Sequence, residues 1–170
     1  MNTKIIFLDT AEANEIGELT EVIVRINRSA ATVKGGRRFS FSSLNVAGNR
    51  SGIVGYGYGK ARQVPMAIEK GNKDARKHLM LVPINAAGSI PHEVSGKYCG
   101  SRIRLIPASE GTGIIAGASV RSVCELAGIR NILTKCYGST NPINTVKAVF
   151  DALAQLRTPE EVKELRGVDL

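Results

Sequence analysis

Two glycine-rich segments have residue types and spacings suited to holding the phosphates of a nucleotide. The first, residues 55–60, alternates Gly with Tyr and ends in Lys60. A Walker-type phosphate loop also needs a Gly six positions before the Lys and a Ser or Thr directly after it. This chain has Val54 and Ala61 at those positions. The segment therefore does not predict a nucleotide site.

The second segment, residues 111–116, fits the pattern GxGxxA between a predicted strand and a predicted helix. A dinucleotide fingerprint needs an acidic residue about twenty positions further on. Residues 129–137 contain no Asp or Glu. We expect instead a turn whose amides lie at a helix N-terminus, where they can meet an RNA phosphate or an acidic side chain of a partner. A nucleotide-dependent enzyme that uses this turn stays open as an alternative.

Side chains suited to catalysis or metal binding are few. The two histidines, His78 and His92, are single histidines in their segments, and a lone His is more often structural than catalytic. The three cysteines, Cys99, Cys124 and Cys136, share no CxxC spacing. We predict no enzymatic activity, no cofactor, no metal site and no small-molecule substrate.

Basic residues are concentrated in one part of the chain. The 170 residues carry a net charge of +8, with 43% hydrophobic residues, a composition that excludes wholesale disorder. Residues 21–80 hold twelve Lys and Arg against three Asp and Glu. This excess favours a polyanionic partner such as nucleic acid. No apolar run approaches the roughly 18 residues of a membrane span, so we expect a cytoplasmic protein with no membrane partner.

The first half has the patterning of an antiparallel meander followed by a helix. Apolar residues alternate over 21–27, 39–47 and 53–60, which predicts three strands. A basic hairpin loop with a double glycine is expected over 29–38. Apolar residues then recur every three or four positions from Val64 to about Met80, which predicts a helix.

The second half is expected to form a separate unit with the order β, β, α, β, α. Strands are predicted at 92–97, 102–106 and 132–137, and helices at 118–127, where Gly128 ends the helix, and at 144–155. The predicted fold class is therefore α+β with two small domains. The predicted limits are residues 1–18 for an acidic tail, 19–86 and 89–157 for the domains, and 158–170 for a tail or short helix.

Several longer motifs resemble one family, in that family's order, over about residues 19–157. They lie at 32–37, 39–41, 54–65, 100–102, 107–117 and 137–144. Together they resemble the bacterial-type ribosomal protein five of the small subunit. The local departures are Tyr56, where the family commonly has Phe, Ala118, which replaces a common Gly, and the pair at 98–99, which replaces a more polar pair.

The resemblance implies a fold, a function and partners. It implies an N-terminal β-β-β-α domain similar to double-stranded-RNA-binding folds and a C-terminal two-layer domain. It implies a structural constituent of the small ribosomal subunit that supports assembly, decoding accuracy and the entrance of messenger RNA. The implied partners are small-subunit ribosomal RNA, proteins four and eight, and messenger RNA near its channel. A free-standing double-stranded-RNA-binding protein stays open as a second alternative.

Candidate contact residues come from both the charge pattern and the resemblance. The family's RNA-contacting loop, linked with the spectinomycin site, falls on residues 28–38, and a further RNA-facing segment falls on 55–62. From the residues alone, the rings of 56 and 58 either contact RNA or pack onto the first helix. The interface with protein four falls on Gly113 and Arg121. The candidate RNA-binding residues are Arg25, Arg28, Ser29, Thr32, Lys34, Gly35, Gly36, Arg37, Arg38, Tyr56, Tyr58, Lys60 and Arg62.

Overall fold

A computed structural model describes residues 19–167 of the chain. The predicted acidic tail, residues 1–18, and residues 168–170 lie outside the described residues. Within the described part, no helix is both long and apolar enough to cross a membrane. Two four-stranded sheets and four helices make up the fold of residues 19–167, which confirms the predicted α+β class.

The first sheet is antiparallel, with the strand order β1-β2-β3-β4. Its strands are β1 (Thr20–Val33), β2 (Gly36–Gly48), β3 (Ile53–Ala61) and β4 (Leu79–Leu81). The predicted three-stranded meander is confirmed. The short strand β4 was not predicted.

Helix α2 (Val64–Ala75) lies directly on β3 because the strand presents glycines to it. A Cβ atom added to Gly57 would lie 2.1 Å from the carbonyl oxygen of Gly71. Such a close approach of backbone to backbone requires glycine. The helix ends before the predicted Met80, because Leu79 keeps the helical spacing in the sequence but pairs with Gly55 in the sheet.

The second sheet has the strand order β5-β6-β8-β7. Its elements, in chain order, are β5 (Val94–Tyr98), β6 (Ser101–Pro107), β7 (Ile114–Ile115), α3 (Ala118–Ala127), β8 (Ile132–Gly138), α4 (Pro142–Leu153) and α5 (Pro159–Arg166). Helix α3 ends as predicted, because Gly128 takes the left-handed conformation with φ 90°. Helix α4 begins two residues earlier than predicted, because the Asn141 side chain accepts a hydrogen bond from the Ile143 amide.

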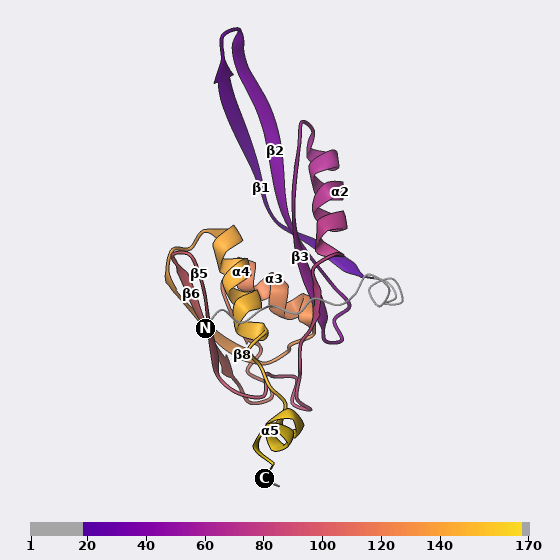
Figure 1. Cartoon of the computed structure of the whole chain (residues 1–170), viewed down its shortest axis with the longest axis vertical. Helices are drawn as coiled ribbons and strands as arrows, with labels where there is room; N and C mark the ends of the chain where they lie inside the picture. Colours follow the sequence, from indigo (N-terminus) through magenta and orange to yellow (C-terminus); the bar gives the residue numbers. More distant parts are fainter. Residues whose placement is uncertain (1–18, 168–170) are drawn as a thin grey trace.

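One buried apolar cluster runs through both halves of the described chain. Helix α3 contacts β1, β2 and β3 as well as α4. The turn between β2 and β3 is bound to the end of α3, since the Arg50 amide donates to the Leu126 carbonyl at 2.9 Å. The far end of the β1–β2 hairpin, where residues 25–39 are all exposed, is the exception to this packing. Figure 1 shows it projecting well away from the rest of the molecule.

Candidate nucleic-acid interface

The projecting hairpin is almost entirely strand. Its two strands pair from Thr20 opposite Gly48 to Val33 opposite Gly36, which leaves only Lys34 and Gly35 for the turn. The loop predicted at 29–38 is therefore wrong, and so is the end of the first strand at residue 27. Every residue from 25 to 39 is exposed. No buried side alternates with an exposed one there, so the sequence carried no period-two signal for this part of the strands.

The basic residues of the hairpin lie on both of its faces. Cross-strand partners share a face, and successive residues alternate between faces. Arg37, opposite Thr32, is on the same face as Asn45, which touches α2. Arg38, opposite Ala31, is on the other face. By the same register, Arg28 lies on the α2 face and Arg25, after the bulge that follows Ile23, lies on the other face. The expected single cluster is thus divided between two faces, with Lys34 at the tip.

Two contacts order side chains on the exposed hairpin. The Arg28 guanidinium lies 3.8 Å from the centroid of the Phe39 ring, a cation–π geometry that leaves the N–H groups at its edge free to donate. The Ser29 hydroxyl donates to the Ser40 carbonyl across the strands at 3.2 Å. The predicted contact residue Ser29 therefore helps to hold the two strands together.

The stretch of sequence that carries this charge contains no acidic residue. Residues 22–62 contain eight Lys and Arg and no Asp or Glu. Lys60 and Arg62 are exposed at the end of β3, and Lys60 pairs in register with Ser42, on the same face as Arg38. By contrast, the basic face of α2 is partly neutralised, since Lys73 bonds Glu69 at 2.7 Å. This hydrogen bond lowers the pKa of Glu69.

The structure separates the two tyrosines of β3. Tyr58 is 43% exposed on the face away from α2. The Tyr56 ring is half-buried, with its centroid 4.6 Å from that of Phe150 in α4 and 5.8 Å from that of His78. Burial raises the pKa of the Tyr56 hydroxyl. Tyr56 therefore packs against His78, which lies in the stretch predicted as the first helix, and against Phe150 of α4, which the sequence did not indicate. Its contact with RNA stays a prediction.

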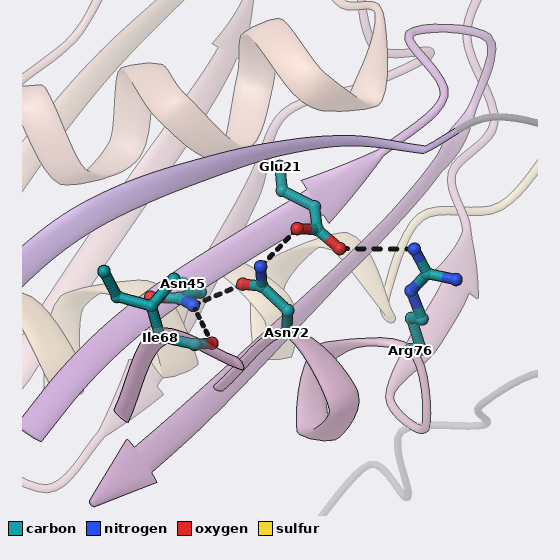
Figure 2. A network of polar contacts seen from close by, with 5 residues as sticks. All are labelled: Glu21, Asn45, Ile68, Asn72 and Arg76. Carbon is teal, nitrogen blue, oxygen red and sulfur yellow. Dashed lines mark hydrogen bonds and ion pairs between the residues drawn. The ribbon is translucent and has the colours of Figure 1, made fainter. Parts of the chain in front are cut away.

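A polar network fixes the base of the hairpin to α2 (Figure 2). The Asn45 side chain, which is 1% exposed, donates to the Ile68 carbonyl at 2.9 Å and to the Asn72 side chain. Asn72 donates in turn to Glu21, which also pairs with Arg76 at 3.3 Å. Sequence analysis missed this network. Its one signal was an Asn between two apolar residues of a strand.

The glycine turn at 111–116 does not form a nucleotide site. Strand β7 separates the turn from α3, whose N-cap is Gly117. The Gly113 amide donates to the Asn131 side chain at 3.0 Å, and the Gly113 carbonyl accepts from the Ile132 amide at 3.1 Å. The amides expected at a helix N-terminus are therefore not there, and that of Gly113 is already bonded inside the protein.

Comparison with known proteins matches both halves of the chain to one family. Residues 19–83 match the family described as "Ribosomal protein S5, N-terminal domain", and residues 96–166 match "Ribosomal protein S5, C-terminal domain". The "Small ribosomal subunit protein uS5" of Blochmanniella floridana is 50% identical over 159 residues, which are 94% of this chain and 90% of that protein. The chain belongs to the ribosomal protein S5 family.

As a member of the S5 family, the protein is a structural constituent of the small ribosomal subunit and not an enzyme. It binds ribosomal RNA and other ribosomal proteins, and it is located in the cytoplasmic ribosome. Family membership does not favour the nucleotide-dependent enzyme or the free-standing RNA-binding protein. Among residues 19–167, no group of three or more His, Cys, Asp and Glu side chains is placed to hold a metal ion.

The two residues predicted to contact protein four, Gly113 and Arg121, lie beside a cavity of about 520 Å³ at the junction of the two halves. Arg121 lines it, donates to the Ile114 carbonyl at 2.7 Å and lies 3.8 Å from Glu125. Gly113 is half-buried next to the lining residue Ile114. Two further guanidinium groups, from Arg50 and Arg130, line the same cavity and were not predicted as interface residues.

Proposed function

We propose that the β1–β2 hairpin is the main element by which this ribosomal protein holds small-subunit rRNA. The proposal rests on the placement of exposed Lys and Arg residues on both faces and at the tip of a projecting hairpin whose one acidic residue, Glu21, lies at its base. The residues proposed to contact RNA are Arg25, Arg28, Ser29, Thr32, Lys34, Gly35, Gly36, Arg37, Arg38, Tyr56, Tyr58, Lys60 and Arg62.

The two-faced distribution of charge decides how such a hairpin binds. A charged patch on one face would meet one RNA surface, whereas Lys and Arg residues on both faces and at the tip can bind phosphates from several directions at once. The hairpin therefore suits insertion between RNA segments. The partial neutralisation of α2 by Glu69 and Glu21 makes that helix a weaker contact than the hairpin.

We further propose that the cavity beside Arg121 faces a neighbouring ribosomal protein, with protein four as the first candidate. Three guanidinium groups against one carboxylate, Glu125, favour a partner that brings acidic side chains. The family resemblance supports this assignment, and it also supports protein eight and messenger RNA as neighbours. Roles in subunit assembly and decoding accuracy follow from the same resemblance.

The experiment is sedimentation of a cell lysate through sucrose gradients at low and at high salt, with the protein followed by immunoblot. The wild type is expected with small subunits at both salts, at about one copy per particle. The variant Lys34→Ala, Arg37→Ala, Arg38→Ala is expected to leave the particles at high salt. A matched variant, Arg157→Ala, Lys163→Ala, Arg166→Ala, removes the same charge near α5 and is expected to stay bound. Loss of both variants alike would contradict a special role of the hairpin.

The domain limits 19–86 and 89–157 are also a proposal. The segment between β4 and β5, residues 82–93, contains no helix or strand, which supports a boundary there. Because one apolar cluster joins the two halves, we expect them to unfold together. Two separate unfolding transitions by circular dichroism in urea would contradict that expectation.

A further inference from the structure

The second sheet has one covered face and one open face. Gly96 of β5 lies against α4, where an added Cβ would be 2.1 Å from the Ala148 carbonyl oxygen, and its cross-strand partner Ile103 is buried. The residues that alternate with these point away from the helices. We call five of them the outer sheet face; all are exposed, and they are Lys97, Arg102, Arg104, Lys135 and Tyr137.

Strand register aligns these side chains in two adjacent rows. Lys97 pairs with Arg102, and Arg102 pairs with Tyr137, so one row crosses β5, β6 and β8. Arg104 pairs with Lys135 in the next row. Directly paired side chains lie about 5 Å apart, so the Tyr137 ring has a guanidinium as its neighbour.

Most of the charge on the outer sheet face is not neutralised within the protein. Arg104 is bonded to Glu93, and that hydrogen bond lowers the pKa of the Glu93 carboxyl group. In the part of the chain that the structure describes, Lys97, Arg102 and Lys135 form no ion pair. A cavity of about 400 Å³ on this face is lined by Arg102, Arg104 and Tyr137 together with Ser95 and Glu93, the partner of Arg104.

We propose that the outer sheet face is a second RNA-binding surface, which takes an unpaired segment of ribosomal RNA. An exposed aromatic ring on an open antiparallel sheet is a platform on which one base can stack, and neighbouring Lys and Arg side chains can bind the flanking phosphates. Tyr137 supplies the ring, and Lys97, Arg102 and Lys135 supply the charge. Bases inside a duplex already stack on one another, so the platform favours single strands.

This surface is separate from the hairpin. It lies on the other sheet, and none of its residues belongs to β1, β2 or β3. Loss of RNA binding at the hairpin therefore leaves this proposal intact, and failure of this proposal leaves the hairpin assignment intact.

A tryptophan probe tests the outer sheet face directly, because the chain contains no Trp. In the full-length Tyr137→Trp variant, titration with a ten-nucleotide oligouridylate is expected to quench the emission by about half or more as a base stacks on the indole. Adding Arg102→Ala and Lys97→Ala to the same variant is expected to raise the oligouridylate concentration at half-maximal quenching about tenfold. The control is the Tyr98→Trp variant, because the side chain at position 98 lies on the helix side of the sheet near Lys147. Its emission is expected to change little when oligouridylate is added.

A second measurement keeps the test valid if the Trp variant fails to fold. In a background with Lys34, Arg37 and Arg38 changed to Ala, the affinity for labelled oligouridylate is expected to survive Tyr137→Phe and to fall about tenfold in Tyr137→Ala. Equal affinity in these two variants, or equal quenching at positions 137 and 98, would overturn the proposal. Quenching at 137 by polyglutamate but not by RNA would also overturn it, because it would assign the face to an acidic protein.

Discussion

The ring of Tyr56 in β3 meets the ring of Phe150 in α4 edge to face, with 60° between the ring planes. The two residues belong to different halves of the molecule, and Phe150 is fully buried. The contact therefore ties the hairpin-bearing sheet to the helical layer of the second half. It also explains why the Tyr56 ring is more buried than the Tyr58 ring.

Removing the Tyr56 ring is expected to destabilise the whole protein. Tyr56→Ala leaves a cavity against Phe150 and should lower the free energy of unfolding by about 2–3 kcal/mol, since the ring is half-buried. Tyr56→Phe keeps the ring and should cost less than about 1 kcal/mol. Urea unfolding measures both. A Tyr56→Ala protein of normal stability with weakened RNA binding would make Tyr56 an RNA contact rather than a packing residue.

The glycine contact between β3 and α2 predicts a large effect of one methyl group. In Gly57→Ala the new Cβ would meet the Gly71 carbonyl oxygen at 2.1 Å and the Ala75 nitrogen at 2.3 Å, so the helix must move. We expect a loss of about 3 kcal/mol or more in thermal or urea unfolding. The matched control is Gly35→Ala in the hairpin turn, where nothing lies within 4 Å and the cost should stay below about 0.5 kcal/mol. Equal effects at the two positions would refute the close packing.

Removing the Asn45 side chain is expected to lower the free energy of unfolding more than removing the ion pair between Glu21 and Arg76. Asn45→Ala leaves the Ile68 carbonyl without its side-chain donor and should cost about 2–3 kcal/mol in unfolding free energy. Glu21→Gln keeps an acceptor for Asn72 but removes the charge facing Arg76, whose side chain is 60% exposed. Because exposed ion pairs contribute little, this change should cost less than about 1 kcal/mol. The reverse order would show that charge, not burial, secures the base of the hairpin.

The three thiols are expected to react in a fixed order. Cys99 is exposed, Cys136 is partly buried, and burial raises the pKa of Cys124 to about 12. The thiolate is the reactive form, so at about pH 8 a disulfide reagent such as DTNB should modify Cys99 quickly, Cys136 slowly and Cys124 only after unfolding. Cys99→Ser should remove the fast phase alone. Rapid reaction of two thiols in that variant would show that the α3 core opens readily.

Elements whose signals are local could be predicted from the sequence. Helix α3 ends where expected because a glycine in the left-handed conformation stops a helix regardless of its surroundings. Helix α2 is shorter than its spacing predicts, because Leu79 satisfies the helical period while its pairing partner Gly55 lies far back in the chain. Residue propensities and the spacing of apolar residues carry no information about such a long-range strand pairing.

The candidate site was predictable in composition but not in geometry. The charge of residues 22–62 favours a polyanionic partner such as nucleic acid, since it depends only on residue types. The division of Arg28 and Arg38 between two faces depends on strand register, which the exposed sequence did not specify. The packing role of Tyr56 required knowing that Phe150, distant in the chain, lies against it.

The most direct test of the central claim is the salt dependence of binding between the full chain and small-subunit rRNA. Each phosphate contact contributes about 0.7–0.9 to the slope of log K against log salt. The variant Lys34→Ala, Arg37→Ala, Arg38→Ala should therefore reduce the slope by about 2–3, while Arg157→Ala, Lys163→Ala, Arg166→Ala should leave it unchanged. An unchanged slope in the hairpin variant would contradict the assignment of this hairpin as the rRNA-binding element.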